Sequence, residues 1–151
     1  EKIKSLDIDI AIYDALKKNK AKILGICLGM QLLGKSSTED GFTEGLNLID
    51  NSVEKIDHTK KLKVPHIGFD KIEIHNSESF FKDVKTKSAF YFVHSFKMLN
   101  NAPISEIATC NYGDEFVAAF QKNNIYGTQF HPEKSQKNGL KILENFLKWK
   151  L

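Results

Sequence analysis

The chain has 151 residues and a formal net charge of +3, and its 41% hydrophobic and 27% charged residues are ordinary for a soluble globular protein. A chain of this length can bury one core without disulfide or metal staples, so residues 1–151 are expected to form a single domain. No apolar run approaches the roughly 20 residues of a membrane span, and residues 1–20 lack the apolar core of a signal peptide, which predicts a cytoplasmic protein with no membrane partner. The lysines are scattered, which argues against a nucleic-acid-binding face.

The beginning of the chain predicts a helix, a strand and a second helix. Apolar residues at spacings of three and four indicate a helix over residues 3–19, and the apolar run at residues 22–26 indicates a strand. An amphipathic segment follows from Leu28, and the polar run at residues 36–41 is typical of a loop. Loops at such a position often contact ligand, so this loop is expected to do so.

The remainder of the chain is dominated by short β-branched and aromatic runs, which favour strands. These runs lie at residues 52–56, 67–74, 89–96, 107–112, 115–121 and 125–130. The last three are joined by Gly113-Asp114 and Asn123-Asn124, both good hairpin turns, and therefore predict an antiparallel meander. Ser135 is a candidate N-cap for a final amphipathic helix that reaches Leu151. Together these elements predict an α/β fold with a mixed sheet flanked by helices.

The sequence Gly25-Ile26-Cys27-Leu28-Gly29 lies where the first strand passes into the second helix. The pattern is typical of a nucleophile elbow, in which glycines on both sides let neighbouring backbone pass closely. Cys27 would stand near a helix N-terminus, where unpaired N–H groups favour the thiolate. The alternative is a buried structural cysteine, which is a common state of a free thiol.

The other cysteine and histidines are interpreted without a metal or cofactor. Cys110 is expected to be a buried core residue, and the spacing of the two cysteines favours neither a disulfide scaffold nor a zinc site. His66 and His94 have no acidic or cysteine ligand at a suitable spacing to complete a metal site with His131. His58 is expected at the surface.

His131, Pro132 and Glu133 lie between the last predicted strand and the final helix, at the edge of the sheet where open α/β proteins bind ligands. Proline favours an extended backbone, which would direct His131 and Glu133 to the same side. A carboxylate beside an imidazole selects its tautomer and stabilises the imidazolium. With Cys27, these residues are the parts needed for covalent acyl transfer. The alternative is that His131 only precedes a helix whose first turn holds Glu133.

Four motifs, in order along nearly the whole chain, resemble class I glutamine amidotransferases. They are Gly25-Ile26-Cys27-Leu28-Gly29-Met30-Gln31, Val64-Pro65-His66-Ile67-Gly68-Phe69, Phe90-Tyr91-Phe92-Val93-His94-Ser95 and Phe130-His131-Pro132-Glu133-Lys134-Ser135. Within that family, the last three are similar to the glutaminase subunits of imidazole glycerol phosphate synthases. The resemblance implies a flavodoxin-like fold and release of ammonia from glutamine through a cysteine thioester, without a cofactor.

The resemblance also assigns roles to individual residues. It implies that Cys27 is the nucleophile, that His131 is the general base and acid, and that Glu133 orients His131. The Leu28 N–H would donate to the oxyanion. The residues that would hold or line the glutamine site are Gln31, Glu39, His94, Ser95 and Phe96.

A partner is implied as well, because ammonia must reach a second active site. The family resemblance suggests a heterodimer with a synthase (cyclase) subunit of histidine biosynthesis, contacted by Lys134 and by the segment from Val64 to Asp70, which includes Phe69. The alternative for Lys134 is an ordinary solvent-exposed lysine.

The chain departs from the family pattern in two ways. Family members begin with roughly fifty further residues, whose Pro-Gly-Val-Gly loop completes the oxyanion hole; nothing here matches that loop, so the sequence is expected to be N-terminally incomplete. Phe69 and Phe96 stand where tryptophan and tyrosine are usual. The difference at Phe69 leaves open a glutaminase subunit for a sugar amidotransferase of surface-glycan biosynthesis, and the missing N-terminal region leaves open a non-catalytic partner-binding remnant. A separate alternative is a cysteine hydrolase acting on small acyl or peptide substrates, which would not need Gln31 and Glu39.

Overall fold

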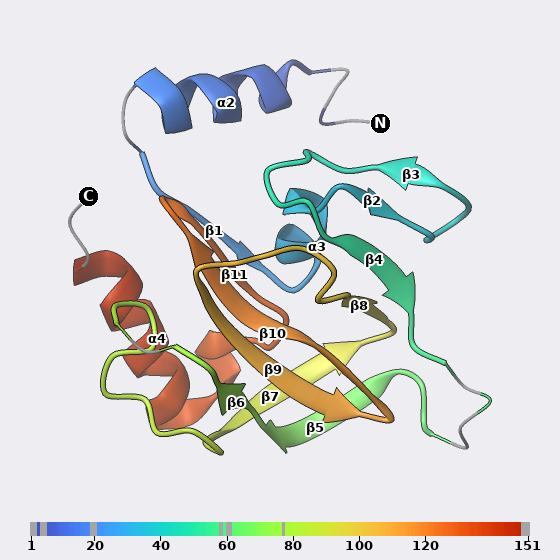
Figure 1. Cartoon of the computed structure of the whole chain (residues 1–151), viewed down its shortest axis with the longest axis vertical. Coiled ribbons are helices and arrows are strands. Elements are labelled where there is room, and N and C mark those ends of the chain that lie inside the picture. The colour runs from blue at the N-terminus through green and yellow to red at the C-terminus, as the bar shows by residue number, and fades with distance from the viewer. Residues whose placement is uncertain are drawn as a thin grey trace.

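Two β-sheets with helices around them form the frame of the molecule (Figure 1). The computed structural model describes residues 3, 6–18, 21–57, 59, 62–76 and 78–148. The predicted surface residue His58 and the predicted helix end at Leu151 lie outside these residues. The elements are α2 (Ile8–Lys18), β1 (Ile23–Ile26), α3 (Leu28–Leu33), β2 (Ser36–Ser37), β3 (Thr43–Glu44), β4 (Ser52–Lys55), β5 (His66–Lys71), β6 (Glu73–Ile74), β7 (Ala89–His94), β8 (Phe96–Met98), β9 (Glu106–Tyr112), β10 (Asp114–Lys122), β11 (Ile125–Thr128), the 3-10 turn η2 (Pro132–Lys134) and α4 (Gln136–Lys148).

The larger sheet is mixed, as predicted. Its strand order is β1-β11-β10-β8-β4-β2-β3, with β9 also paired to β10 and β6 paired to β9. β1 runs parallel to β11, and β2 runs parallel to β4, whereas the other pairs are antiparallel. The predicted meander is confirmed, since β9, β10 and β11 are successive antiparallel neighbours.

The smaller sheet pairs β5 with β7, and it shows where the strand predictions were wrong. The segment 67–74 is divided at Ile72 into β5 and β6, and the segment 89–96 is divided at Ser95 into β7 and β8. In each case the chain leaves the smaller sheet and joins the larger one. The apolar pattern continues across both breaks because Ile72 and Phe96 pack against core residues, so the pattern does not reveal them.

Other element boundaries also differ from the predictions. Within the helix predicted over residues 3–19, Leu6 and Asp7 form a turn before α2 begins at Ile8, and the predicted loop at residues 36–41 begins with the short strand β2. Ser135 does not cap α4 with its side chain. Its hydroxyl instead donates to the carbonyl of His131 and accepts the N–H of Tyr91, because the preceding 3-10 turn places it against β7.

Two apolar clusters lie on opposite faces of β10, since successive side chains of a strand alternate. Phe116 and Ala118 belong to a cluster that contains Phe90, Phe92 and Ile142 of α4. Val117, between them, belongs to a second cluster under α3 that includes buried Met30, Leu33, Val53 and Met98. The sheet therefore lies between two packed apolar layers. This packing holds in place the strand ends that carry the candidate site.

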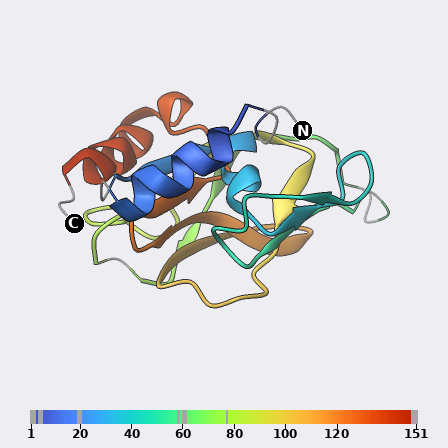
Figure 2. The ribbon, with the colours of Figure 1, turned by 90° about the horizontal axis from the view of Figure 1, so that it is seen from above.

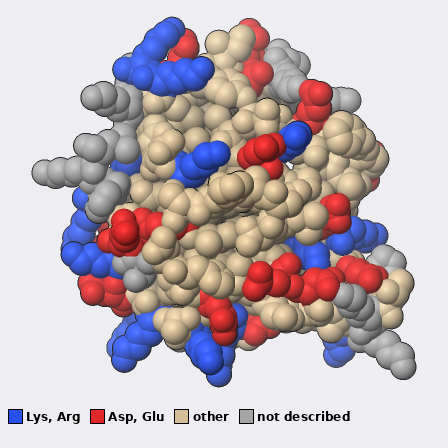
Figure 3. All heavy atoms as spheres, viewed as in Figure 1, with Lys and Arg blue, Asp and Glu red and all other residues tan. Residues whose placement is uncertain are grey.

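The helices α3 and α4 pack against the two apolar clusters. Figure 2 shows α2 lying across one end of the sheet and α4 along one side. Lys side chains on the face shown in Figure 3 are scattered and interspersed with Asp and Glu, so the described residues form no continuous basic band there. Among the described helices, none combines the length and apolarity needed to cross a membrane.

Candidate active site

Cys27 occupies a sharp turn at the end of β1. Its N–H donates to the Thr128 carbonyl at 2.7 Å, which continues the β1–β11 pairing, while its own carbonyl accepts the Gln31 N–H at 3.2 Å and opens α3. Its φ of 51° and ψ of −109° are unusual for a residue with a side chain. Such strain is typical of a nucleophile presented between a strand and a helix. The predicted elbow is therefore present in the backbone.

The two glycines that flank the elbow are not equivalent. A Cβ on Gly25 would lie 2.6 Å from backbone atoms of Gly29 and Met30, so this position requires glycine. A Cβ on Gly29 would meet no atom within 4 Å. The expectation of close backbone approach is thus confirmed at Gly25 and is wrong at Gly29.

The Cys27 thiol is half-buried among polar groups. Its Sγ lies 3.8 Å from the Val93 carbonyl and 3.8 Å from Nε2 of Gln129. Burial raises the pKa of Cys27, and the charge of Glu133 adds to this, whereas hydrogen bonds from the Leu28 N–H and Gln129 act in the opposite direction. The expectation of a favoured thiolate is therefore wrong, because desolvation outweighs the N–H groups at the start of the six-residue helix α3. A nucleophile in this environment needs a base.

Cys110 differs completely. It lies in the core on β9, only 3% exposed, and burial raises the pKa of its thiol to about 12. The prediction of a buried structural cysteine is confirmed.

His131 and Glu133 contact each other directly. Nδ1 of His131 lies 2.8 Å from Oε1 of Glu133, and the two side chains are 22% and 49% exposed. The backbone between them is a 3-10 turn beginning at Pro132, so the expected extended conformation is wrong although the expected contact is present. The N–H of His131 donates to the Tyr91 carbonyl at 2.8 Å, which anchors the turn to β7.

Parallel pairing brings the elbow and this turn to the same edge of the sheet. Ile26 pairs with Thr128, so Cys27 follows the end of β1 while His131 follows the end of β11. Electrostatic effects also indicate that these groups are close. The charge of Glu133 raises the pKa of Cys27, and the charge of His131 lowers the pKa of His94. The structure therefore gathers Cys27, His131 and Glu133 in one region.

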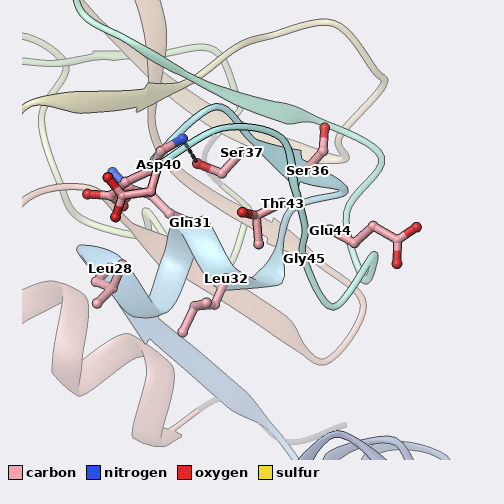
Figure 4. Close-up of a pocket in the computed structure, with 10 residues that line it drawn as sticks. Leu28, Gln31, Leu32, Ser36, Ser37, Asp40, Thr43, Glu44 and Gly45 are labelled. Atoms are coloured by element: carbon pink, nitrogen blue, oxygen red, sulfur yellow. Dashed lines mark hydrogen bonds between the residues drawn. The ribbon is translucent and has the colours of Figure 1, made fainter. Parts of the chain in front are cut away.

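A cavity of about 570 Å³ opens beside the elbow (Figure 4). In Figure 4, Leu28 and Leu32 of α3 lie on one side of it, and side chains of β2 and β3 lie on the other. Its lining residues are Leu28, Gln31, Leu32, Ser36, Ser37, Glu39, Asp40, Thr43, Glu44 and Gly45. Two of the residues predicted to bind substrate, Gln31 and Glu39, thus share this cavity, and Leu28 connects it to Cys27.

Of the other residues predicted to bind substrate, Phe96 and His94 are connected to this cavity through Gln31, and Ser95 is not. Nε2 of Gln31 donates to the Phe96 carbonyl at 2.8 Å, and the same carbonyl accepts from Nδ1 of His94 at 2.7 Å. The Ser95 carbonyl instead accepts the N–H of Ile56 at 2.9 Å, which ties it to the end of β4. Phe96 is therefore the member of this group that contacts a cavity residue directly.

Gln129 is a site residue that sequence reasoning missed. It is fully buried, accepts a hydrogen bond from Nε2 of Gln31 at 3.0 Å, and directs its own Nε2 at Cys27 Sγ. The available signal was a polar residue within the apolar run that leads to His131. A polar side chain at a strand end near a candidate nucleophile is a reason to suspect such a role.

Of the residues predicted to contact a partner, Phe69 and Lys134 lie at the surface around Tyr91, whereas His66 of the same segment is buried. Ile67 and Phe69 on β5 are 60% and 51% exposed. The Phe69 ring packs edge-to-face on Tyr91 at 5.5 Å, and Nζ of Lys134 lies 5.8 Å from the centre of the Tyr91 ring. Phe69 and Lys134 are thus linked through Tyr91. Within the described part of the chain, no three His, Cys, Asp or Glu side chains converge as metal ligands.

Comparison with known proteins assigns the family. The sequence profile described as glutamine amidotransferase class-I matches residues 2–149. The chain belongs to the class I glutamine amidotransferases. It is 44% identical over 144 residues to imidazole glycerol phosphate synthase subunit HisH 1 of Campylobacter jejuni, a match that covers 95% of this chain and 71% of that relative.

Further relatives of this class I glutamine amidotransferase show the same family. It is 43% identical over 138 residues to imidazole glycerol phosphate synthase subunit HisH of Escherichia coli, covering 90% of this chain and 68% of the relative. The crystal structure of a candidate GMP synthase component from Thermoplasma acidophilum superposes with a TM-score of 0.66 at 26% identity, covering 94% of this chain and 63% of that one. The chain thus spans about two thirds of the length of these proteins.

Proposed function

We propose that this chain hydrolyses glutamine and passes the released ammonia to a synthase partner. The observation that carries the proposal is that the elbow residue Cys27 and the contacting pair His131 and Glu133 lie at the same edge of the sheet. Membership of the class I glutamine amidotransferases supplies the reaction class, and the identity to HisH subunits favours imidazole glycerol phosphate synthase of histidine biosynthesis.

In the proposed first step, Cys27 Sγ forms a bond with the side-chain carbonyl carbon of glutamine. Because burial raises the pKa of Cys27, its proton must be removed as the bond forms. Nδ1–H of His131 donates to Glu133, which leaves Nε2 of His131 as the proton acceptor. His131 then delivers this proton to the amide nitrogen as the C–N bond breaks, which releases ammonia and leaves a thioester.

The second step reverses these roles. His131 takes a proton from a water molecule whose oxygen attacks the thioester carbon, and the thiol of Cys27 regains its proton as glutamate leaves. In both steps the carbonyl oxygen becomes negatively charged. In the proposal, the N–H of Leu28, at the start of α3 and beside the thiol, donates to that oxygen.

The cavity beside the elbow suits the amino-acid end of glutamine. Glu39, Asp40 and Glu44 place carboxylates around it, which favour the α-ammonium group. Gln31 has its Nε2 committed to Phe96 and Gln129, so its Oε1 is oriented as an acceptor. The Phe96 carbonyl, which also accepts from His94, supports this wall through Gln31.

A substitution of each cysteine in the full-length protein tests the nucleophile. Cys27→Ser is expected to lower glutamate release by at least about a thousandfold, whereas the matched Cys110→Ser variant keeps its turnover. A glutamine-analogue electrophile should label the peptide containing Cys27 and spare Cys110, as read by mass spectrometry. Undiminished hydrolysis in Cys27→Ser would contradict the proposal and favour a non-catalytic role.

We further infer that Ile67, Phe69, Tyr91 and Lys134 form the surface that contacts the synthase. Ile67 and Phe69 are exposed apolar side chains, and Lys134 lies over the Tyr91 ring nearby. Such a combination is typical of a protein–protein interface. Phe69→Ala should weaken binding to a (β/α)8-barrel cyclase about tenfold or more, whereas Phe42→Ala, which removes another exposed phenylalanine, should not. Binding to a sugar amidotransferase instead of the cyclase would support the alternative partner.

A further inference from the structure

Two buried histidines face each other between the strands of the smaller sheet. His66 on β5 pairs directly with His94 on β7, and Nδ1 of His66 lies 3.0 Å from Nε2 of His94. The two side chains are 3% and 6% exposed. His66 is stacked between the rings of Phe92 and Tyr112, with ring centres 4.9 and 3.9 Å away. This packing fixes the plane of the His66 ring.

The hydrogen-bond partners determine where the protons lie. The Phe96 carbonyl can only accept, so Nδ1 of His94 must carry a proton. Burial lowers the pKa of His94 to about 4, so the ring is neutral near pH 7 and its Nε2 is an acceptor. The contact with His66 therefore requires a proton on Nδ1 of His66. The chain of donation runs from His66 through His94 to the Phe96 carbonyl.

This chain continues without a break to the candidate nucleophile. The Phe96 carbonyl also accepts from Nε2 of Gln31 at 2.8 Å, and Gln31 donates to Oε1 of Gln129 at 3.0 Å. Nε2 of Gln129 then lies 3.8 Å from Cys27 Sγ. A displacement of the Phe96 carbonyl would alter the orientation of Gln31, which lines the cavity, and of Gln129, which contacts the thiol.

A carboxylate lies at the outer end of the chain, where the neutral His66 ring, with its proton on Nδ1, has no proton on Nε2 to donate to it. Nε2 of His66 lies 3.5 Å from Oδ2 of Asp70, whose side chain is 40% exposed. Asp70 raises the pKa of His66, whereas burial, the larger effect, lowers it. On the opposite side, His131 and the buried Lys97, which pairs with Asp114 at 3.2 Å, both lower the pKa of His94. These positive charges add to the larger effect of burial and thus keep the His94 ring neutral.

We propose that His66 is a positioning residue for the glutamine site: its Nδ1–H keeps His94 in the tautomer that holds the Phe96 carbonyl against Gln31. The effect on catalysis rests on the proposed function, since it is measured through glutamine. The arrangement of protons does not rest on it and can be measured separately.

Two substitutions at His66 separate donation from packing. His66→Phe fills the space between Phe92 and Tyr112 but removes the donor, so Nε2 of His94 loses its buried partner. Its KM for glutamine is expected to rise about tenfold with a smaller change in kcat. His66→Asn keeps an N–H donor at the position of Nδ1 and should stay within about threefold of the wild-type KM. Tyr112→Phe, which keeps the stack, is the matched control and should behave as wild type.

A wild-type KM in His66→Phe would overturn the proposal, as would a rise in His66→Asn as large as that in His66→Phe. Nitrogen-15 NMR of the imidazoles in the full-length protein provides a second readout that needs no activity. We expect protonated Nδ1 on both His66 and His94 and unprotonated Nε2 on His94 from about pH 6 to 8. A proton on Nε2 of His94 would overturn the proposal even if glutamine is hydrolysed. Protein that shows the expected tautomers but does not hydrolyse glutamine would contradict only the proposed function.

Discussion

Two regions of the molecule place imidazole side chains in opposite environments. One is the turn with His131 and Glu133, and the other is the strand pair with His66 and His94. The first contact joins residues two positions apart on a partly exposed turn. The second joins opposite strands in the core. A carboxylate beside a partly exposed imidazole can stabilise the imidazolium, whereas a buried neutral pair can only orient its neighbours. The comparison therefore supports the proposed division, with proton transfer at the turn and positioning at the strand pair.

Removal of the imidazole from the turn gives the largest expected effect. His131→Asn in the full-length protein should lower kcat for glutamate release by about a thousandfold, because it removes the proposed base. Its free energy of unfolding should change by less than about 1 kcal/mol, since the side chain is partly exposed and the backbone bond to Tyr91 remains. Steady-state kinetics and urea unfolding measure the two quantities. A large loss of stability with little loss of kcat would reverse the comparison.

The strand pair should instead govern stability in acid. The pKa of His94 is lowered from 6.5 to about 4, so the unfolded chain binds more protons between these values. The free energy of unfolding is therefore unaffected by this group above about pH 6.5. It decreases as the pH falls towards 4, by on the order of 3 kcal/mol. The pKa of His66 is lowered too and acts in the same direction.

Urea unfolding between pH 7 and 4 measures this effect. His94→Asn removes the titrating ring while keeping a donor for the Phe96 carbonyl, so its stability should fall less steeply with acid than that of the wild type. Phe92→Leu is the control, because it disturbs the stack on His66 without removing a titrating group and should lower the curve in parallel. Identical slopes for wild type and His94→Asn would show that the strand pair does not titrate as proposed.

The smallest expected effect concerns the link between the two regions. The Ser135 hydroxyl accepts the N–H of Tyr91 on β7 and donates to the carbonyl of His131. Ser135→Ala should lower the free energy of unfolding by about 1–2 kcal/mol, since both groups lose a partner, and should reduce kcat only a few-fold. Thermal unfolding and steady-state kinetics provide the test. An unchanged midpoint would show that the turn is held without this link.

Much of the local architecture could be predicted from short-range pattern. Strand-like runs joined by Asn123-Asn124 and Gly113-Asp114 predicted the meander, and the Gly-x-Cys-x-Gly sequence predicted the elbow at Cys27. The contact between His131 and Glu133 was predicted for the wrong reason. Two residues that flank a proline can meet in an extended segment or in a 3-10 turn, and spacing does not distinguish these conformations.

The predictions from sequence were wrong where a segment distant in the chain changed the hydrogen bonding or burial of a side chain. Ser135 resembles an N-cap, but β7 offers its hydroxyl the Tyr91 N–H. A helix N-terminus favours a thiolate, but burial of Cys27 outweighs it. The breaks at Ile72 and Ser95 follow from a change of sheet that the apolar pattern does not register.

Periodicity, turn chemistry and motif order in these 151 residues were sufficient for the α/β class, the family resemblance and the proposed catalytic group, because each depends on residues close together in the chain or on a known order of motifs. Strand register and burial decided the rest. They place His66 opposite His94, connect Gln31 and Gln129 to Cys27, and set the pKa of its thiol. Hydrogen-bond partners and desolvation depend on which distant segments pack together, and that is a property of the folded chain alone.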